Sequence, residues 1–308
     1  MNSPPLLTAE AMASFTARGF LRFDAVVPEA INQAFLKEMG DIAPPAPGQR
    51  MMRTYGEMLA RAGVPEAAAG TLLDRVYAPG TALSDLLQVP VVAGAIRSLA
   101  GPDPVFDHHF LHVTFPPAYH EAAGQENLPQ HNHQDSTIDP RTAFDIQIMY
   151  YPHAVTREMG GTRFLPGSHL RKVSEAAIAR YQNIRGQQHM VCPAGTVLIV
   201  HSGIWHGGGL NLSDQTRTMF KIRINPGKSQ TAQFDLSTLV PQAHQRPIFY
   251  VKGPQPHSVE AILMTPEPWH ENDTGRLEFV NRIKLWRYIT GDDAYDADYW
   301  MTRLETLA

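Results

Sequence analysis

Histidine is concentrated in one part of this 308-residue chain. Eleven of its fourteen histidines lie between His108 and His206. Histidine is the commonest side-chain ligand for metal ions in proteins, and its imidazole also titrates near neutral pH. We therefore expect metal or acid–base chemistry in this part of the sequence.

Within this part, the segment QHNHQDSTID places His131, His133 and Asp135 two residues apart. In an extended chain these three side chains point to the same side. A histidine and an aspartate from one strand end, joined by a histidine from elsewhere, make the facial triad of non-haem Fe(II) sites, which leaves three coordination positions open. A polar loop in a histidine-rich chain is the alternative. His133 is favoured over His131 because only His133 has a carboxylate two residues further on.

The third ligand must come from another strand, and the candidates are His153, His169, His189, His201 and His206. His206 is favoured because the apolar strand GTVLIVH leads toward it, and the three glycines after it permit close approach of the backbone to a ligand. A further strand then begins near Arg217, eleven residues later. There Arg217, Met219, Lys221 and Arg223 alternate with Thr218, Phe220, Ile222 and Ile224, so the three cations share one face.

Arg217 is the cation of this strand that fits a cosubstrate. Its guanidinium offers the bidentate fork that the far carboxylate of a dicarboxylate requires. An edge strand with a wet, basic face is the alternative interpretation. Four further histidines fall on the strand and loop expected beside the site and are candidates for substrate contact: His108, His109, His112 and His120.

The elements that must position these residues are short strands. From residue 105 onward, runs such as VFDHHFLHVTF, AFDIQIMYY and TRTMFKIRI are separated by Pro, Gly, Asn and Asp clusters. This pattern is typical of an antiparallel sandwich or barrel. We expect the region 107–130 and the tail after residue 230 to shape the pocket.

The first third of the chain reads as mostly helical, with one short strand, FLRFDAVV. Thr8 suits the N-cap of a helix over 8–18 and Gly19 its end, and Pro28 and Pro90 each suit the first position of a helix. APPAPG at 43–48 reads as a loop. The segment 276–289 predicts an amphipathic helix whose cations form a solvated surface: Arg276, Arg282, Lys284 and Arg287.

Composition narrows the class of protein. A net charge of −4 gives no sign of nucleic-acid or membrane-surface binding. The single cysteine, Cys192, excludes an intrachain disulfide framework and a multi-thiolate metal site. No apolar run approaches the roughly 18 residues of a membrane span, and the start lacks the pattern of a signal peptide. We expect a soluble, cytoplasmic, globular protein whose oligomeric state the sequence does not indicate.

Three separated signals, in order, resemble the phytanoyl-CoA dioxygenase family: His133-Gln134-Asp135, GGTRFLPGSH at 160–169 and HGGGLNLSDQTR at 206–217. The opening LTAEAMASFTARGFLRFDAVVPEAI also resembles the family, so the likeness runs from about residue 6 to 226. The resemblance implies a mainly β fold with flanking helices, the double-stranded β-helix (jelly roll, cupin-like). It implies a single oxygenase domain over 1–308, divided into a mostly helical part (1–104), a jelly-roll core with the metal site (105–226) and a C-terminal extension with a helix (227–308).

The resemblance also implies roles for particular residues. His133, Asp135 and His206 resemble the Fe(II) ligands, and Arg217 resembles the anchor of the C5 carboxylate of 2-oxoglutarate. Some members carry an aromatic residue near the cosubstrate, where this chain has Met149; Gln147 on the same strand face is a candidate substitute. Some carry a hydroxyl two residues after the distal histidine, where this chain has Gly208. We interpret the PGSH turn, Asn211 and Ser213 as structural.

The activity implied is that of an Fe(II)- and 2-oxoglutarate-dependent dioxygenase. Such an enzyme hydroxylates an unactivated C–H bond of a small organic substrate with dioxygen and releases succinate and carbon dioxide. Related halogenases lack the carboxylate ligand, so Asp135 favours oxygenation. Three alternatives are a metal-dependent cupin-like dioxygenase or isomerase that does not use 2-oxoglutarate, a zinc hydrolase, and a non-catalytic binding module on the same fold. The sequence does not indicate the substrate.

Overall fold

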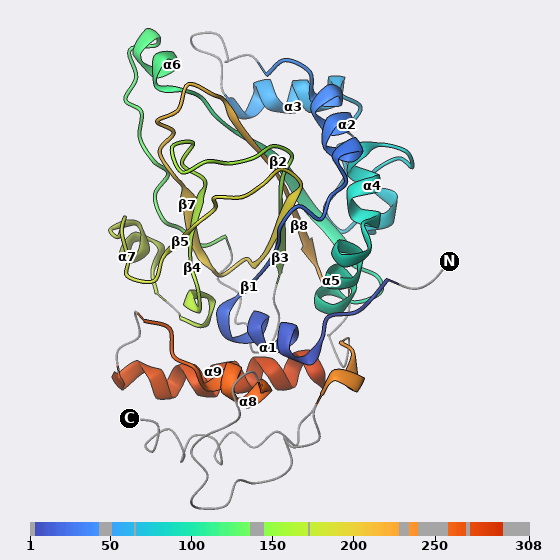
Figure 1. Cartoon of the computed structure of the whole chain (residues 1–308), viewed down its shortest axis with the longest axis vertical. Helices are drawn as coiled ribbons and strands as arrows, with labels where there is room; N and C mark the ends of the chain where they lie inside the picture. Colours follow the sequence, from blue (N-terminus) through green and yellow to red (C-terminus); the bar gives the residue numbers. More distant parts are fainter. Residues whose placement is uncertain are drawn as a thin grey trace, which may run out of the picture.

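Two antiparallel sheets build the core of the protein (Figure 1). The computed structural model describes residues 4–42, 51–64, 66–135, 145–171, 173–227, 234–239, 258–268 and 272–291. The larger sheet runs in the order β1 (Phe20–Phe23), β6 (Thr196–His201), β3 (Ile146–Tyr151), β8 (Arg217–Asn225) and β2 (Val105–Thr114). The smaller sheet runs β5 (Gln188–His189), β4 (Thr162–Leu165) and β7 (Trp205–Gly208). The predicted mainly β jelly roll with flanking helices is confirmed.

Alternation along the strands gives the larger sheet two different faces. On β3, Ile146, Ile148 and Tyr150 belong to a core cluster shared with the helices. Met149 and Tyr151, which alternate with them, belong to a second cluster that contains Phe164 of the smaller sheet. Since side chains of a strand point alternately to opposite faces, one face packs on helices and the other on the smaller sheet.

Strand β8 lies inside the larger sheet, between β3 and β2. Phe220, Ile222 and Ile224 face the helices, and Arg217 and Lys221 are both buried, each residue being about 6% exposed. The alternative of an edge strand with a wet, basic face is therefore wrong.

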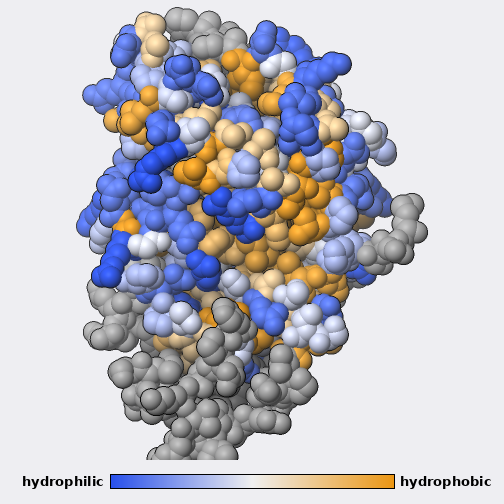
Figure 2. All heavy atoms as spheres, viewed as in Figure 1, coloured by the Kyte–Doolittle hydropathy of each residue, from blue (hydrophilic) through white to orange (hydrophobic). Residues whose placement is uncertain are grey.

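Helices form the outer layer and the base of the molecule (Figure 1). The N-terminal part contributes α1 (Ala9–Arg18), α2 (Glu29–Met39), α3 (Met51–Arg61), a 3-10 turn η1 (Leu73–Arg75), α4 (Ala82–Gln88) and α5 (Pro90–Ala100). Later ones are α6 (Pro117–Ala122), η2 (Ser168–Leu170), α7 (Glu175–Ala179), η3 (Leu236–Thr238), α8 (Val259–Met264) and α9 (Asn272–Thr290). Hydrophobic side chains gather across the middle of the face that Figure 2 shows, and hydrophilic ones line its left margin.

The predicted helix ends agree closely with the structure. Thr8 Oγ1 accepts a hydrogen bond from the Ala11 N–H, and Gly19 ends α1 with φ 78°. Pro90 occupies the first turn of α5, whereas Pro28 precedes α2 as its N-cap, one residue earlier than expected. The loop predicted at 43–48 lies outside the described residues. Among the helices described, no single one is long and apolar enough to cross a membrane, although α4 and α5, bent by 72°, satisfy that test as a pair.

Helix α9 confirms the predicted amphipathic helix, and of the cations predicted to be solvated Lys284 is exposed but Arg282 is not. Phe279, Ile283 and Trp286 are buried, as expected. Arg282 is also fully buried; it pairs with Glu278 at 2.8 Å and donates to the Thr265 carbonyl at 2.6 Å. The expectation of a solvated Arg282 is wrong, because the C-terminal end of α8 packs against it and the Leu263 and Thr265 carbonyls accept hydrogen bonds from its guanidinium. The side chain of Arg276 lies outside the part described.

Candidate metal centre

A pair of backbone hydrogen bonds brings two predicted ligands together. His133 and His206 face each other in an antiparallel bridge, in which each N–H donates to the other's carbonyl at 2.9 Å. Directly opposed residues in such a bridge carry their side chains on the same face. The two imidazole rings accordingly lie with centroids 4.4 Å apart. The segment that ends in Asp135 thus continues the smaller sheet alongside β7.

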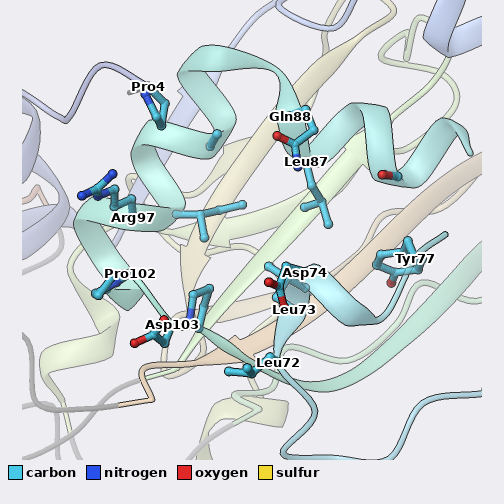
Figure 3. A pocket seen from close by; sticks show the side chains of 15 residues that line it. Pro4, Leu72, Leu73, Asp74, Tyr77, Leu87, Gln88, Arg97, Pro102 and Asp103 are labelled. Atoms are coloured by element: carbon cyan, nitrogen blue, oxygen red, sulfur yellow. The ribbon is translucent and has the colours of Figure 1, made fainter. Parts of the chain in front are cut away.

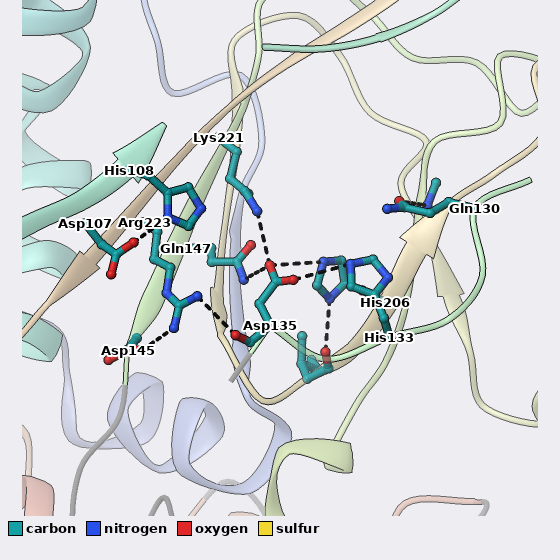
Figure 4. A network of polar contacts seen from close by, with 12 residues as sticks. Asp107, His108, Gln130, His133, Asp135, Asp145, Gln147, His206, Lys221 and Arg223 are labelled. Atoms are coloured by element: carbon teal, nitrogen blue, oxygen red, sulfur yellow. Dashed lines mark hydrogen bonds and ion pairs between the residues drawn. The ribbon is translucent and has the colours of Figure 1, made fainter. Parts of the chain in front are cut away.

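Asp135 completes the group (Figure 4). Its Oδ1 lies 3.4 Å from His133 Nε2 and its Oδ2 lies 3.8 Å from His206 Nε2. One ligand atom from each of the three residues can be chosen so that all lie within 4.8 Å of one another. Two imidazole nitrogens and one carboxylate oxygen are the donor set of a non-haem Fe(II) facial triad.

Backbone carbonyls orient both imidazoles for metal binding. His133 Nδ1 lies 3.0 Å from the His131 carbonyl, and His206 Nδ1 lies 3.0 Å from the Ile204 carbonyl. A carbonyl only accepts, so each Nδ1 carries the proton and each Nε2 keeps its lone pair. Fixing the tautomer through the second ring nitrogen is the usual arrangement around a histidine ligand. These residues therefore fit a divalent transition metal.

The surroundings of Asp135 and His206 favour the protonation states of these two residues that bind metal. Burial would raise the pKa of Asp135, but its hydrogen bond with His133 and the charges of His206 and Lys221 hold that pKa well below its usual range. Burial, together with the nearby His133, lowers the pKa of His206 to about 4. Burial would lower the pKa of His133, but its contacts with Asp135 raise it. An ionised carboxylate and a neutral imidazole are the forms that bind a cation.

Two further side chains hold the Asp135 carboxylate. Lys221 Nζ lies 3.1 Å from Asp135 Oδ2, and Gln147 Nε2 donates to the same oxygen. Figure 4 shows both pointing at Asp135 from neighbouring strands. Gln147 was predicted as a contact of 2-oxoglutarate; the structure places it against a metal-ligand candidate, and cosubstrate binding by Gln147 stays a prediction.

A cavity of about 400 Å³ adjoins the triad, within the range of small-molecule sites. Its lining includes His133, His206, Met149, Arg217 and Lys221. Met149 is thus placed as predicted, although its contact with a cosubstrate is untested.

Arg217 is held rigidly at the cavity wall. Its guanidinium donates to Thr114 Oγ1 at 2.7 Å, to the Met159 carbonyl at 3.3 Å and to the Gly160 carbonyl. The loop before it is fixed by Asn211, whose side chain donates to the carbonyls of Thr114 and Gln215. The structural interpretation of Asn211 is therefore confirmed.

The three glycines after His206 differ in what they permit. A Cβ atom on Gly207 would lie 2.9 Å from the carbonyl oxygens of Gln130 and His131, and one on Gly209 would lie 2.6 Å from the Gly160 carbonyl oxygen. A Cβ on Gly208 would meet its nearest atoms only at 3.6 Å. Gly207 and Gly209 thus allow backbone segments to approach one another, and Gly208 and Gly209 both line the cavity. Close approach of a ligand to these glycines stays a prediction.

The other candidate histidines have other partners. His169 Nε2 contacts the Thr16 carbonyl from the PGSH turn, whose Gly167 has φ 79°. His201 Nδ1 accepts from the Gly203 N–H, and His153 Nε2 accepts from the Thr218 N–H. His131 is exposed and contacts Gln182. None of these four lies in the group that could hold the metal.

The walls of the cavity agree with only part of the prediction. His112, Thr114, His120 and Gln130 line it, so the region 107–130 contributes as expected. Thr114 and Gln130 were not singled out, since nothing in their spacing marks them. The tail after residue 230 was also expected to contribute. Its described parts line no part of this cavity, because α8 and α9 pack against α1 instead, so that expectation is wrong for them.

A second cavity, of about 330 Å³, lies among η1, α4 and α5 (Figure 3). Leu72, Leu87 and Ile96 contribute apolar surface to it, and Arg97 lies at its margin. No residue of the triad lines it. Of these two cavities, only the first is therefore lined by residues of the triad.

Comparison with known proteins gives a family match. A family model described as phytanoyl-CoA dioxygenase (PhyH) matches residues 15–219. Among curated proteins, none matches the chain. Similar solved structures include the non-haem α-ketoglutarate-dependent carbocyclase SnoK from nogalamycin biosynthesis, at 21% identity, covering 71% of this chain and 86% of that chain with a TM-score of 0.47.

Two structures from Streptomyces are comparably similar. HygX from Streptomyces hygroscopicus, with nickel and 2-oxoglutarate bound, is 13% identical over 72% of this chain and 88% of its own, with a TM-score of 0.47. AviO1 from Streptomyces viridochromogenes is 17% identical over 73% of this chain and 97% of its own, with a TM-score of 0.48.

Proposed function

Because the chain belongs to the phytanoyl-CoA dioxygenase family, whose members are 2-oxoglutarate-dependent non-haem iron enzymes, we propose that it hydroxylates an unactivated C–H bond of a small organic substrate. The reaction consumes dioxygen and 2-oxoglutarate and releases succinate and carbon dioxide. In this proposal residues 1–308 form one oxygenase domain, and the site lies in its jelly-roll core.

The observation that carries the proposal is the convergence of His133, Asp135 and His206 beside a cavity that Arg217 also lines. Fe(II) bound by the triad supplies the activation of dioxygen that is coupled to decarboxylation of 2-oxoglutarate. The three side chains would hold this metal, and a site with two imidazoles and one carboxylate would keep coordination positions for the reactants.

Arg217 anchors the C5 carboxylate of 2-oxoglutarate in this proposal. Its contacts with Thr114 and with two backbone carbonyls fix the guanidinium before the cosubstrate arrives. A pre-organised guanidinium loses little conformational freedom on binding and matches a carboxylate bidentately. Met149 and Met219 line the same cavity and exclude water beside the reacting groups.

Succinate formation tests the proposal directly. The full chain, loaded anaerobically with Fe(II) and then given 2-oxoglutarate and air, is expected to form succinate. His133→Ala and Asp135→Ala are expected to abolish this activity, and His131→Ala, which removes an exposed imidazole two residues from His133, serves as the control. Unchanged succinate formation in Asp135→Ala would contradict the ligand assignment.

Arg217→Ala separates cosubstrate binding from metal binding. Loss of a charge-assisted hydrogen-bonded pair costs about 1.5–3 kcal/mol, which corresponds to an increase of about 10- to 150-fold in the 2-oxoglutarate concentration required. The Fe(II) affinity of this variant is expected to stay unchanged. A cupin-like enzyme that does not use 2-oxoglutarate would form no succinate and would show no such dependence.

A further inference from the structure

Lys221 is a second buried cation at the metal centre. It lies on the inner face of β8, opposite Phe110 of β2 and Met149 of β3 in the sheet register. Its side chain is about 8% exposed, and its Nζ lies 3.1 Å from Asp135 Oδ2 and 5.4 Å from the centre of the Phe110 ring. Figure 4 shows the ammonium pointing toward the triad.

Arg217 and Lys221 face the same cavity at different positions. They are four residues apart on one strand, a rise of about 13 Å at roughly 3.3 Å per residue. The Arg217 guanidinium donates to the Gly160 carbonyl, whereas the Lys221 ammonium contacts the Asp135 carboxylate. A cosubstrate whose distal carboxylate lies on Arg217 therefore leaves Lys221 for a different group.

The charges of the site leave Lys221 in excess when the reactants of the proposed function are bound. A divalent metal on Asp135 and two neutral imidazoles carries one positive charge. The two carboxylates of 2-oxoglutarate and the guanidinium of Arg217 bring this total to zero. Lys221 then adds a positive charge, and no Asp or Glu is among the described residues that line the cavity. Asp135, which Lys221 contacts at 3.1 Å, is then shared with the metal, so this arrangement favours an anionic ligand beside the buried ammonium.

A neighbouring imidazole supplies a second polar group. His112 lies on β2, lines the same cavity, and has a buried Nε2 that finds no hydrogen-bond partner within the part of the chain that the structure describes. Burial is the main cause, and the charge of Lys221 the second, that lowers the pKa of His112 to about 3, so its imidazole is neutral. A neutral imidazole near an ammonium can donate one hydrogen bond to a bound oxyanion.

We propose that Lys221 binds an anionic group of the substrate, a carboxylate in the simplest case, and that His112 contributes a hydrogen bond to it. This inference rests on the proposed function and specifies its substrate class: small organic acids rather than neutral molecules. The substrate anion would lie beside the metal ligand Asp135, which places the carbon chain of a small acid within the cavity.

Binding of acetate to the nickel-loaded full chain tests this inference without turnover. The 2-oxoglutarate affinity is measured first by calorimetry, in the wild type and in Lys221→Gln, and is expected to agree within about twofold. Acetate and its neutral counterpart acetamide are then titrated into the complex with 2-oxoglutarate. Acetate is expected to bind saturably and acetamide at least tenfold more weakly, and Lys221→Gln is expected to lose that preference. Lys221→Arg should retain it, and Lys37→Gln, which removes an exposed charge from α2, should also retain it.

The other outcomes distinguish the two proposals. Failure of the wild type to bind 2-oxoglutarate would overturn the proposed function. Normal 2-oxoglutarate binding without acetate binding, or acetate binding that persists in Lys221→Gln, would overturn only the anion site. A tenfold loss of 2-oxoglutarate affinity in Lys221→Gln would assign Lys221 to the cosubstrate. Weaker nickel binding with unchanged acetate preference would limit Lys221 to positioning Asp135, which also overturns the inference.

Discussion

The metal centre depends on residues that carry no reactive group. Gly207 follows His206 directly and lets the strand approach the segment that carries His133 to within a backbone hydrogen bond. The two ligands can share one face only while this approach is maintained. The distance between the two imidazoles therefore depends on the lack of a Cβ atom at Gly207 as well as on the histidines themselves.

Substitutions at Gly207 and Gly208 test whether the close backbone approach is needed for metal binding. Gly207→Ala would place its Cβ 2.9 Å from two carbonyl oxygens, so we expect the bridge between His133 and His206 to open and the Fe(II) affinity to fall at least tenfold. Gly208→Ala, whose Cβ has its nearest neighbours at 3.6 Å, is the matched control and should retain most of the affinity. Metal titration followed by fluorescence or calorimetry measures both. Equal affinities in the two variants would contradict this account of the bridge.

The sequence predicted which side chains share a face where reactive residues are spaced two or four apart in an extended segment. His133 and Asp135 stand two residues apart, and Arg217 and Lys221 share a period-two face, so the sequence shows that each pair lies on one side of a strand. The contact between Lys221 and Asp135 was not predictable in this way. It joins segments 86 residues apart, and only the packing of β8 against the segment 130–135 brings them together.

At the scale of elements, the limits of prediction appear in β2. Phe106 and Leu111 both pack in the core shared with the helices, although strict alternation would place them on opposite faces. The register shifts between Phe106 and His108, so a bulge reverses the alternation there. As a result His112 and Thr114 face the cavity, while His109 contacts Tyr77 on the helical side. Composition identifies the strand, but a one-residue bulge decides which histidines reach the site.

Helix α9 offers a test of element packing. Arg282→Met would remove the closest partner of the buried Glu278 and leave Arg171 at 3.6 Å, so we expect a loss of about 3 kcal/mol in the free energy of unfolding, the lower end for breaking a buried pair. Lys284→Met, an exposed position two residues further along the same helix, should change it by less than about 0.5 kcal/mol. Urea-induced unfolding of both variants measures the difference. A loss below about 1 kcal/mol in Arg282→Met would show that the pair contributes little.

The whole molecule buries several histidines in the neutral form. Burial is the largest cause in each case: it lowers the pKa of His109 to about 4, of His112 and His201 to about 3, and that of His169 well below its usual value. In the unfolded chain each has a pKa near 6.5. Below that pH the unfolded state therefore binds more protons than the folded state, and stability falls as the pH decreases toward 4.

This behaviour is measurable in the metal-free chain. Each buried neutral histidine is expected to contribute a slope of up to about 1.4 kcal/mol per pH unit between pH 6 and 4. His201→Gln should reduce the slope of the wild type by about that amount, whereas His131→Gln, at an exposed position, should leave it unchanged. Urea-induced unfolding at a series of pH values provides the slopes. Identical slopes in His201→Gln and the wild type would show that His201 takes up a proton in the folded state.

The bridge between His133 and His206 lies between two further backbone hydrogen bonds, from the Gln130 N–H to the Gly208 carbonyl and from the Asp135 N–H to the Ser202 carbonyl. A cation held by both imidazoles would tie the two segments together in the middle of these contacts. Release of the metal and opening of the two amides to exchange with solvent then become linked events. How slowly those two amide protons exchange would report how tightly the cation is held.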